Sequence, residues 1–139
     1  MVDRLFQKYP GQIRLVLYHM PWSPKSSQAA EASLCAGQEG KFWEYHELLF
    51  DYQEQWPGTP HPEEYFIGYA KLLGLDQQKF RTCLDSQEMR DKVSQDKSYG
   101  KSININTTPT IFVNDSRIVG DEPIEKYERA IEQELRRSG

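Results

Sequence analysis

The sequence predicts an α/β protein in which a long helical segment separates an early strand from a late β-hairpin. Residues 13–18 form a nearly continuous apolar run, which is typical of a strand covered on both faces. Residues 23–102 show helical periodicity with repeated helix-start signals. Residues 110–119 form two short β-prone runs joined by Asn114-Asp115, which predicts a hairpin.

The length of 139 residues suits one domain with its own apolar core, which we place at residues 1–139. The formal net charge of −4 provides no attraction to nucleic acid or to an anionic membrane. No apolar run approaches the ~20 residues that span a bilayer, and residues 1–6 lack the apolar stretch of a secretory signal. We therefore expect no nucleic-acid partner, no membrane partner and, from these residues alone, a cytoplasmic location.

The first predicted elements are short. Residues 5–9 look like the end of a helix, because Pro10-Gly11 stops it. The strand at residues 13–18 follows. Ser23-Pro24 then begins a helix, with Ser as the N-cap and Pro at the first helical position, and this helix is expected to reach about Gln38.

Four more helices are expected before the hairpin. Trp56 closes the apolar stripe of the second helix and Gly74 ends the third, while Asp76 and Ser86 are the N-caps of the fourth and fifth. The inward-facing residues are expected to be Phe42, Tyr45, Leu49, Tyr52 and Trp56, then Phe66, Tyr69, Ala70 and Leu73, then Phe80, Cys83 and Leu84, and finally Met89 and Val93.

Pro123 begins a last helix after the hairpin, with Ile124, Tyr127, Ile131 and Leu135 on its inner face. A parallel-type strand, a helical segment, a two-stranded meander and a covering helix follow one another in this chain. This is the order of a thioredoxin fold in which residues 23–102 are a helical insertion.

The histidines and tryptophans suggest no separate chemistry. His19, His46 and His61 lack the spacing of a helix-borne metal site, so we expect no metal and no cofactor. The tryptophans are expected to anchor the core and the loops, and they are Trp22, Trp43 and Trp56.

Three stretches carry a family resemblance: residues 35–50, residues 80–86 and residues 107–114, the last reading Thr-Thr-Pro-Thr-Ile-Phe-Val-Asn. Together and in this order they resemble the bacterial DsbA-type thiol–disulfide oxidoreductases. The first stretch is similar to that family's helical insertion, and the last is similar to its cis-proline loop. The resemblance covers nearly the whole chain and implies a thioredoxin-like fold with an inserted helical domain.

The family places a C-x-x-C motif after its first strand, at the start of its first helix, whereas this sequence has only Cys35 and Cys83. We therefore expect an N-terminally truncated fold without that strand and without the start of that helix. No catalytic residue is assigned. The expected function is a DsbA-like oxidoreductase domain that is redox-inactive as written. The alternative is a non-catalytic module, built on the thioredoxin fold, that binds peptides or proteins or that oligomerises.

Cys35 and Cys83 leave two structural interpretations open. Each lies on the apolar side of a helix, where an unbonded cysteine packs as a small apolar residue, and this is the interpretation that we favour. A disulfide between them is the alternative, and it would contribute roughly 4 kcal/mol in the chain-entropy model. We expect no thiolate chemistry, because Cys35 lies late in its helix near the negative end of the dipole.

Thr108-Pro109 is the predicted substrate-binding site. From spacing alone, Pro109 would simply begin a strand. The resemblance implies instead a cis bond, in a loop where the residue before proline offers its backbone to an extended polypeptide. Polypeptides are therefore the substrates that we expect at this loop.

An absent first strand would leave the strand at residues 13–18 and the hairpin without the partner between them. Buried strand groups that lack a partner each cost on the order of 1–3 kcal/mol. The natural protein then contains the strand, or the two sheet pieces pair directly, or a second copy fills the gap. We expect the last, a homodimer through exposed sheet edges. Relatives in bacteria commonly work outside the cytoplasm, so the compartment stays open.

Overall fold

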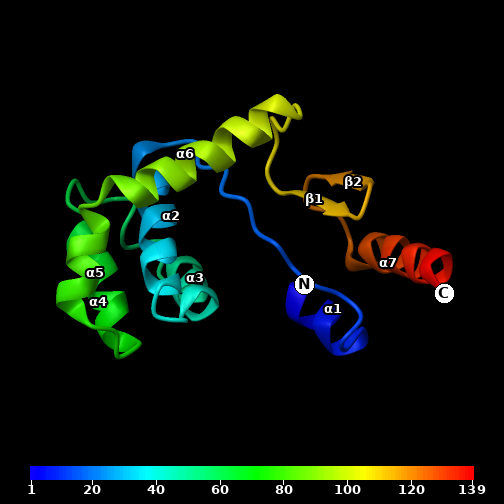
Figure 1. Ribbon diagram of the computed structural model, residues 1–139, viewed down its shortest axis with the longest axis horizontal. Coiled ribbons are helices and arrows are strands. Elements are labelled where there is room, and N and C mark those ends of the chain that lie inside the picture. Colours follow the sequence, from blue (N-terminus) through cyan, green and yellow to red (C-terminus); the bar gives the residue numbers. More distant parts are fainter. The chain divides into compact units, whose positions relative to one another are not determined.

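The structure is a computed structural model that describes all 139 residues. The chain divides into two compact units, and each is described here by itself. One unit contains residues 1–17 and 100–139, and the other contains residues 18–99. Six helices are followed by a two-stranded hairpin and a last helix (Figure 1), so the predicted α/β class is confirmed.

The unit of residues 18–99 is helical. It contains α2 (Pro24–Gly37), α3 (Phe42–Asp51), α4 (Glu63–Leu72), α5 (Gln77–Leu84) and most of α6 (Gln87–Ser102). Two of the predicted N-caps have the expected geometry. The Ser23 hydroxyl oxygen accepts from the Ser26 amide at 3.1 Å, and an Asp76 carboxylate oxygen accepts from the Gln78 amide at 3.0 Å. Local capping therefore determines where α2 and α5 begin.

The core of this unit forms where α2 packs against α3 and α5 (Figure 1). The face of α2 that points inward consists of small residues, among them Ala32 and Ala36, so neighbouring helices approach it closely. Larger side chains from the other helices fill the remaining volume. The buried residues of this core are Ala29, Ala32, Cys35, Ala36, Tyr45, Leu49, Phe66, Ile67, Tyr69, Ala70, Leu75, Phe80, Cys83 and Met89.

The other unit contains α1 (Val2–Lys8), β1 (Thr110–Val113), β2 (Ser116–Val119) and α7 (Ile124–Ser138). The two strands are antiparallel, and Ile111 lies opposite Ile118 in their register. The buried residues of this unit are Leu5, Tyr9, Ile118, Tyr127 and Ile131. The amphipathic helix α7 and the short α1 therefore share one small core with the hairpin.

Polar contacts at the edge of this core join α1 to α7. The Tyr9 hydroxyl donates to Glu132 at 2.9 Å, and the Lys8 ammonium lies 2.9 Å from Glu128. None of the helices in the chain has both the length and the apolar character that a membrane-spanning segment needs.

The predicted strand at residues 13–18 is wrong. The sheet contains β1 and β2 alone, and residues 13–18 have no strand assignment. Val16 and Tyr18 are both 58% exposed. An apolar run becomes a strand only where another backbone pairs with it, and the chain places no partner beside this segment. The predicted association of two copies through sheet edges stays a prediction, as does the status of residues 23–102 as an insertion.

Two further expectations need correction. Helix α3 ends at Asp51 rather than at Trp56, because the following residues turn toward their own partners. Tyr52 stacks on Tyr69 with ring centroids 5.3 Å apart, and the Trp56 indole donates to the Leu49 carbonyl at 3.0 Å. Trp56 is an anchor as expected, whereas Trp22 and Trp43 are exposed and are not core residues.

Candidate functional site

The predicted substrate-binding loop lies between the end of α6 and the start of β1. Within it, the Thr108–Pro109 peptide bond is cis. Thr107, Thr108 and Pro109 are all exposed. The cis peptide bond therefore lies on the surface of its unit.

Contacts from β2 and its end hold both sides of this loop. The Arg117 guanidinium donates to the Ile103 carbonyl at 2.6 Å and lies 5.0 Å from the Phe112 ring centroid, so it is fixed over the hairpin. The Gly120 amide donates to the Pro109 carbonyl at 2.8 Å. The loop is therefore tied to β2 before and after the Thr108–Pro109 step.

A third contact lies inside the loop. The Thr110 hydroxyl donates to the Thr107 carbonyl at 2.5 Å, which bridges the Thr108–Pro109 step. The strand that follows, β1, pairs with β2 along one edge only. A held, exposed loop that leads into a strand with one edge open is suited to strand addition by an extended peptide.

The two cysteines belong to the helical unit and not to the unit of the loop. They form a disulfide that joins α2 to α5. Cys35 is 2% exposed and Cys83 is 8% exposed, so neither sulfur is presented to a substrate. The favoured expectation of unbonded cysteines is wrong, because the packing of α2 on α5 brings together two residues that are far apart in sequence.

One cluster in the helical unit was not predicted from the sequence. His19 and His46 both contact Phe42, with ring centroids 5.9 Å and 6.0 Å from it. Burial lowers the pKa of both imidazoles, and Asp96 and Glu47 only partly oppose this for His19 and His46 respectively. The i, i+4 spacing of Phe42 and His46 was visible in the sequence, but the approach of His19 depends on tertiary packing.

These lowered pKa values predict that the helical unit loses stability in mild acid. The unfolded chain binds protons at His19 and His46 with pKa values near 6.5, more readily than the folded chain does. The stability that the two neutral imidazoles contribute is therefore fully present above about pH 6.5. It is lost as the pH falls through that value and then through their lower pKa values in the folded chain. Chemical denaturation at a series of pH values from about 7 to about 5 would measure how steeply the free energy of unfolding depends on pH.

The His46→Gln variant is the matched control for this slope, and we expect a shallower pH dependence from it. Burial raises the pKa of Glu31, although Arg90 beside it partly opposes this. Glu31 therefore stabilises the folded chain as the pH falls, which is opposite to the effect of the histidines. Glu31 is the same in both proteins, so the difference between their slopes isolates the histidine. Equal slopes would refute the assignment to His46.

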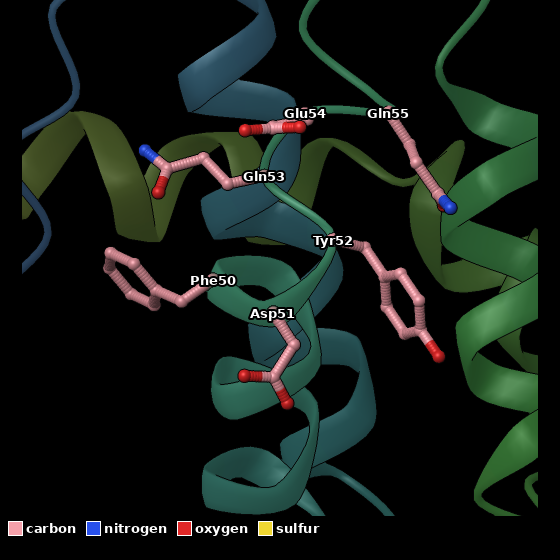
Figure 2. Close-up of a pocket in the computed structure, with 6 residues that line it drawn as sticks. All are labelled: Phe50, Asp51, Tyr52, Gln53, Glu54 and Gln55. Atoms are coloured by element: carbon pink, nitrogen blue, oxygen red, sulfur yellow. The ribbon is translucent and has the colours of Figure 1, made fainter.

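A hollow of about 430 Å³ lies at the end of α3 and is lined by Phe50, Asp51, Tyr52, Gln53, Glu54 and Gln55. Figure 2 shows these side chains. Tyr52 and Gln55 point toward α4, where the Tyr69 hydroxyl donates to Gln55 at 3.1 Å. Phe50, Gln53 and Glu54 point to the other side. The hollow contains none of the residues predicted from the sequence as a site.

No group of three or more His, Cys, Asp or Glu side chains has an arrangement that could hold a metal ion. His61, the third histidine, lies in an exposed loop, where its amide donates to the Thr59 hydroxyl at 3.3 Å.

Comparisons with known proteins agree with the fold described above. Residues 1–133 match the protein family described as Thioredoxin. The chain is similar to solved structures of α-DsbA1 from Wolbachia pipientis (TM-score 0.82, 20% identity, 96% of this chain and 74% of that one) and of a thioredoxin-like oxidoreductase from Silicibacter pomeroyi (TM-score 0.80, 24% identity, 97% and 75%). The predicted thioredoxin-like fold is confirmed.

Two kinds of curated relative are longer than this chain. A probable disulfide bond formation protein D from Bacillus anthracis is 22% identical over 99% of this chain, which spans 65% of that protein. A Na(+)/H(+) antiporter NhaA 1 from Salinispora arenicola is 35% identical over 86% of this chain, which spans only 18% of the antiporter. Similarity to the antiporter is therefore confined to a small part of that protein.

Proposed function

Since this chain belongs to the thioredoxin family, we propose that it is a DsbA-like thiol–disulfide oxidoreductase domain that binds extended polypeptides at the Thr108–Pro109 loop. The observation that carries the proposal is the exposed loop that leads into β1. This strand pairs only with β2, so its other edge has no strand beside it. An extended polypeptide could add its backbone here while its side chains remain free to vary. Such a mode suits a domain that acts on many protein substrates.

We further propose that these 139 residues are redox-inactive by themselves. Disulfide exchange requires an exposed thiolate with a second thiol close to it. The sequence has no C-x-x-C motif, and its two cysteines are bonded to each other and buried. Cys35 also lies in the last turn of α2, where the negative end of the helix dipole disfavours a thiolate.

The reduction of insulin by dithiothreitol would test this inactivity. We expect the full chain to leave the rate of insulin precipitation unchanged, because no thiolate of the chain is presented to the substrate. The Cys35→Ala/Cys83→Ala variant is the matched control. A rate with the native chain that clearly exceeds the rate with this variant would show that the cysteines take part in exchange.

Peptide binding requires a separate measurement, because it does not depend on the cysteines. The S-alkylated insulin B chain is a suitable probe, since it is unfolded and cannot exchange disulfides. We expect its addition to the ¹⁵N-labelled chain to shift the amide signals of Thr108 and Thr110 most strongly within their unit. Unchanged signals at both positions under saturating peptide would contradict the proposed loop and would favour a module with a structural role.

A further inference from the structure

Helix α3 carries an exposed aromatic surface that its unit does not use for its core. We define the aromatic face as Phe42, Trp43, His46 and Phe50. Its rings form a continuous series of contacts, with centroids 4.8 Å apart for Phe42 and Trp43, 5.6 Å for Trp43 and His46, and 4.9 Å for His46 and Phe50. Trp43 is 43% exposed and Phe50 is 61% exposed.

The core of the unit is built from a different side of α3. Tyr45 and Leu49 are buried, and Leu48 packs against the same core. The aromatic face follows the spacing of Phe42, His46 and Phe50, which is four residues at each step, so it runs beside the core side along the whole helix. Contiguous exposed apolar surface that is bordered by polar residues is a feature of protein–protein interaction sites.

A stripe of carboxylates borders the aromatic face. Glu44, Glu47 and Asp51 follow one another at spacings of three and four residues, so they lie along one side of α3. Residues 42–70 contain no Lys or Arg. No ion pair within the chain neutralises these three carboxylates. The helix therefore has separate core, aromatic and acidic sides.

The hollow at the end of α3 continues this surface. Phe50 forms one side of it, and the carboxylates of Asp51 and Glu54 line it beside the uncharged side chain of Gln53 (Figure 2). The two carboxylates point to different ends of the hollow (Figure 2), so a cationic side chain that entered it would meet one carboxylate and could contact the ring of Phe50. Both contacts favour an ammonium or guanidinium group.

We propose that the aromatic face and the adjoining hollow bind a segment of another protein in which apolar side chains alternate with Lys or Arg. The apolar side chains would cover Trp43 and Phe50, while the cationic ones would pair with Glu47, Asp51 and Glu54. The charge of the surface selects this partner. Nucleic acid and anionic lipid would be repelled, and a second copy that presented the same helix would bring two acidic stripes together.

The test uses the full ¹⁵N-labelled chain and a short synthetic peptide in which Lys alternates with Phe and Leu. We expect the peptide to shift the amide signals of residues 42–54, and its affinity to fall as salt concentration rises. Phe50→Ala should weaken binding about tenfold, as expected for an aromatic anchor. Glu47→Lys should weaken it about fivefold through charge repulsion. Both side chains are exposed, so both variants should fold, which circular dichroism would check.

Two controls make the outcome decisive. Leu72→Ala removes an apolar side chain that is 66% exposed on α4, and it should change the affinity less than about twofold. A peptide with Glu in place of each Lys should not bind. Equal binding of both peptides, or shifts confined to residues 106–110, would overturn the proposal, and the second result would leave the loop as the peptide site. Self-association that Phe50→Ala abolishes would also overturn it, because the occupant would then be a second copy.

Discussion

Replacing both cysteines by alanine is expected to lower the free energy of unfolding by about 4 kcal/mol, according to the chain-entropy model of disulfide stabilisation. The Cys35–Cys83 bond spans a sequence separation of 48 residues, so its removal returns much loop-closure entropy to the unfolded chain. It also removes the covalent connection between α2 and α5. For a domain with a total stability of ~5–15 kcal/mol, this loss is a large share.

Urea denaturation of the oxidised chain and of the Cys35→Ala/Cys83→Ala variant would measure this loss. The oxidised and the dithiothreitol-reduced native chains provide the control, because they differ in the bond and in nothing else. We expect the reduced chain and the variant to have similar stabilities. A variant within about 1 kcal/mol of the oxidised chain would show that the unfolded state gains little freedom when the bond is removed.

The sequence predicted the helices best where their signals are local. The caps at Ser23 and Asp76 and the stop at Gly74 depend on residues within one turn of the helix ends. Helices α2 and α5 begin, and α2 and α4 end, close to the expected positions. The signal for the hairpin is also local, because Asn114, with a φ of 52°, adopts the left-handed conformation that the turn needs. Such elements can be predicted because their local signals agree with the global fold.

The errors share a different physical origin. The run at residues 13–18 has the composition of a strand, but a strand requires a second backbone at a fixed distance, and composition does not supply one. The length of α3 and the pairing of Cys35 with Cys83 likewise depend on neighbours from other helices. Periodicity correctly placed Tyr45 and Leu49 on the core side of α3. The aromatic face was overlooked because Phe42 was expected to point inward and Trp43 to anchor the core or a loop.

Truncating Tyr45 should destabilise the helical unit by about 3–5 kcal/mol, the range measured for large aromatic residues replaced by alanine in cores. Tyr45 is 0% exposed, and its ring lies 5.5 Å from Phe80 and 6.3 Å from Tyr69, centroid to centroid. The Tyr45→Ala variant would leave a cavity where α3, α4 and α5 meet. Thermal and urea denaturation would both report the loss.

The Tyr45→Phe variant separates the ring from the hydroxyl. The Tyr45 hydroxyl donates to the Phe66 carbonyl at 2.8 Å, and burial raises the pKa of Tyr45, so the group is a neutral donor under ordinary conditions. Losing this buried hydrogen bond should cost only about 1 kcal/mol. Most of the effect of Tyr45→Ala must then come from lost packing. If Tyr45→Phe were as damaging as Tyr45→Ala, the hydrogen bond to α4 would be the main stabilising contact, and the aromatic core would matter less than its burial indicates.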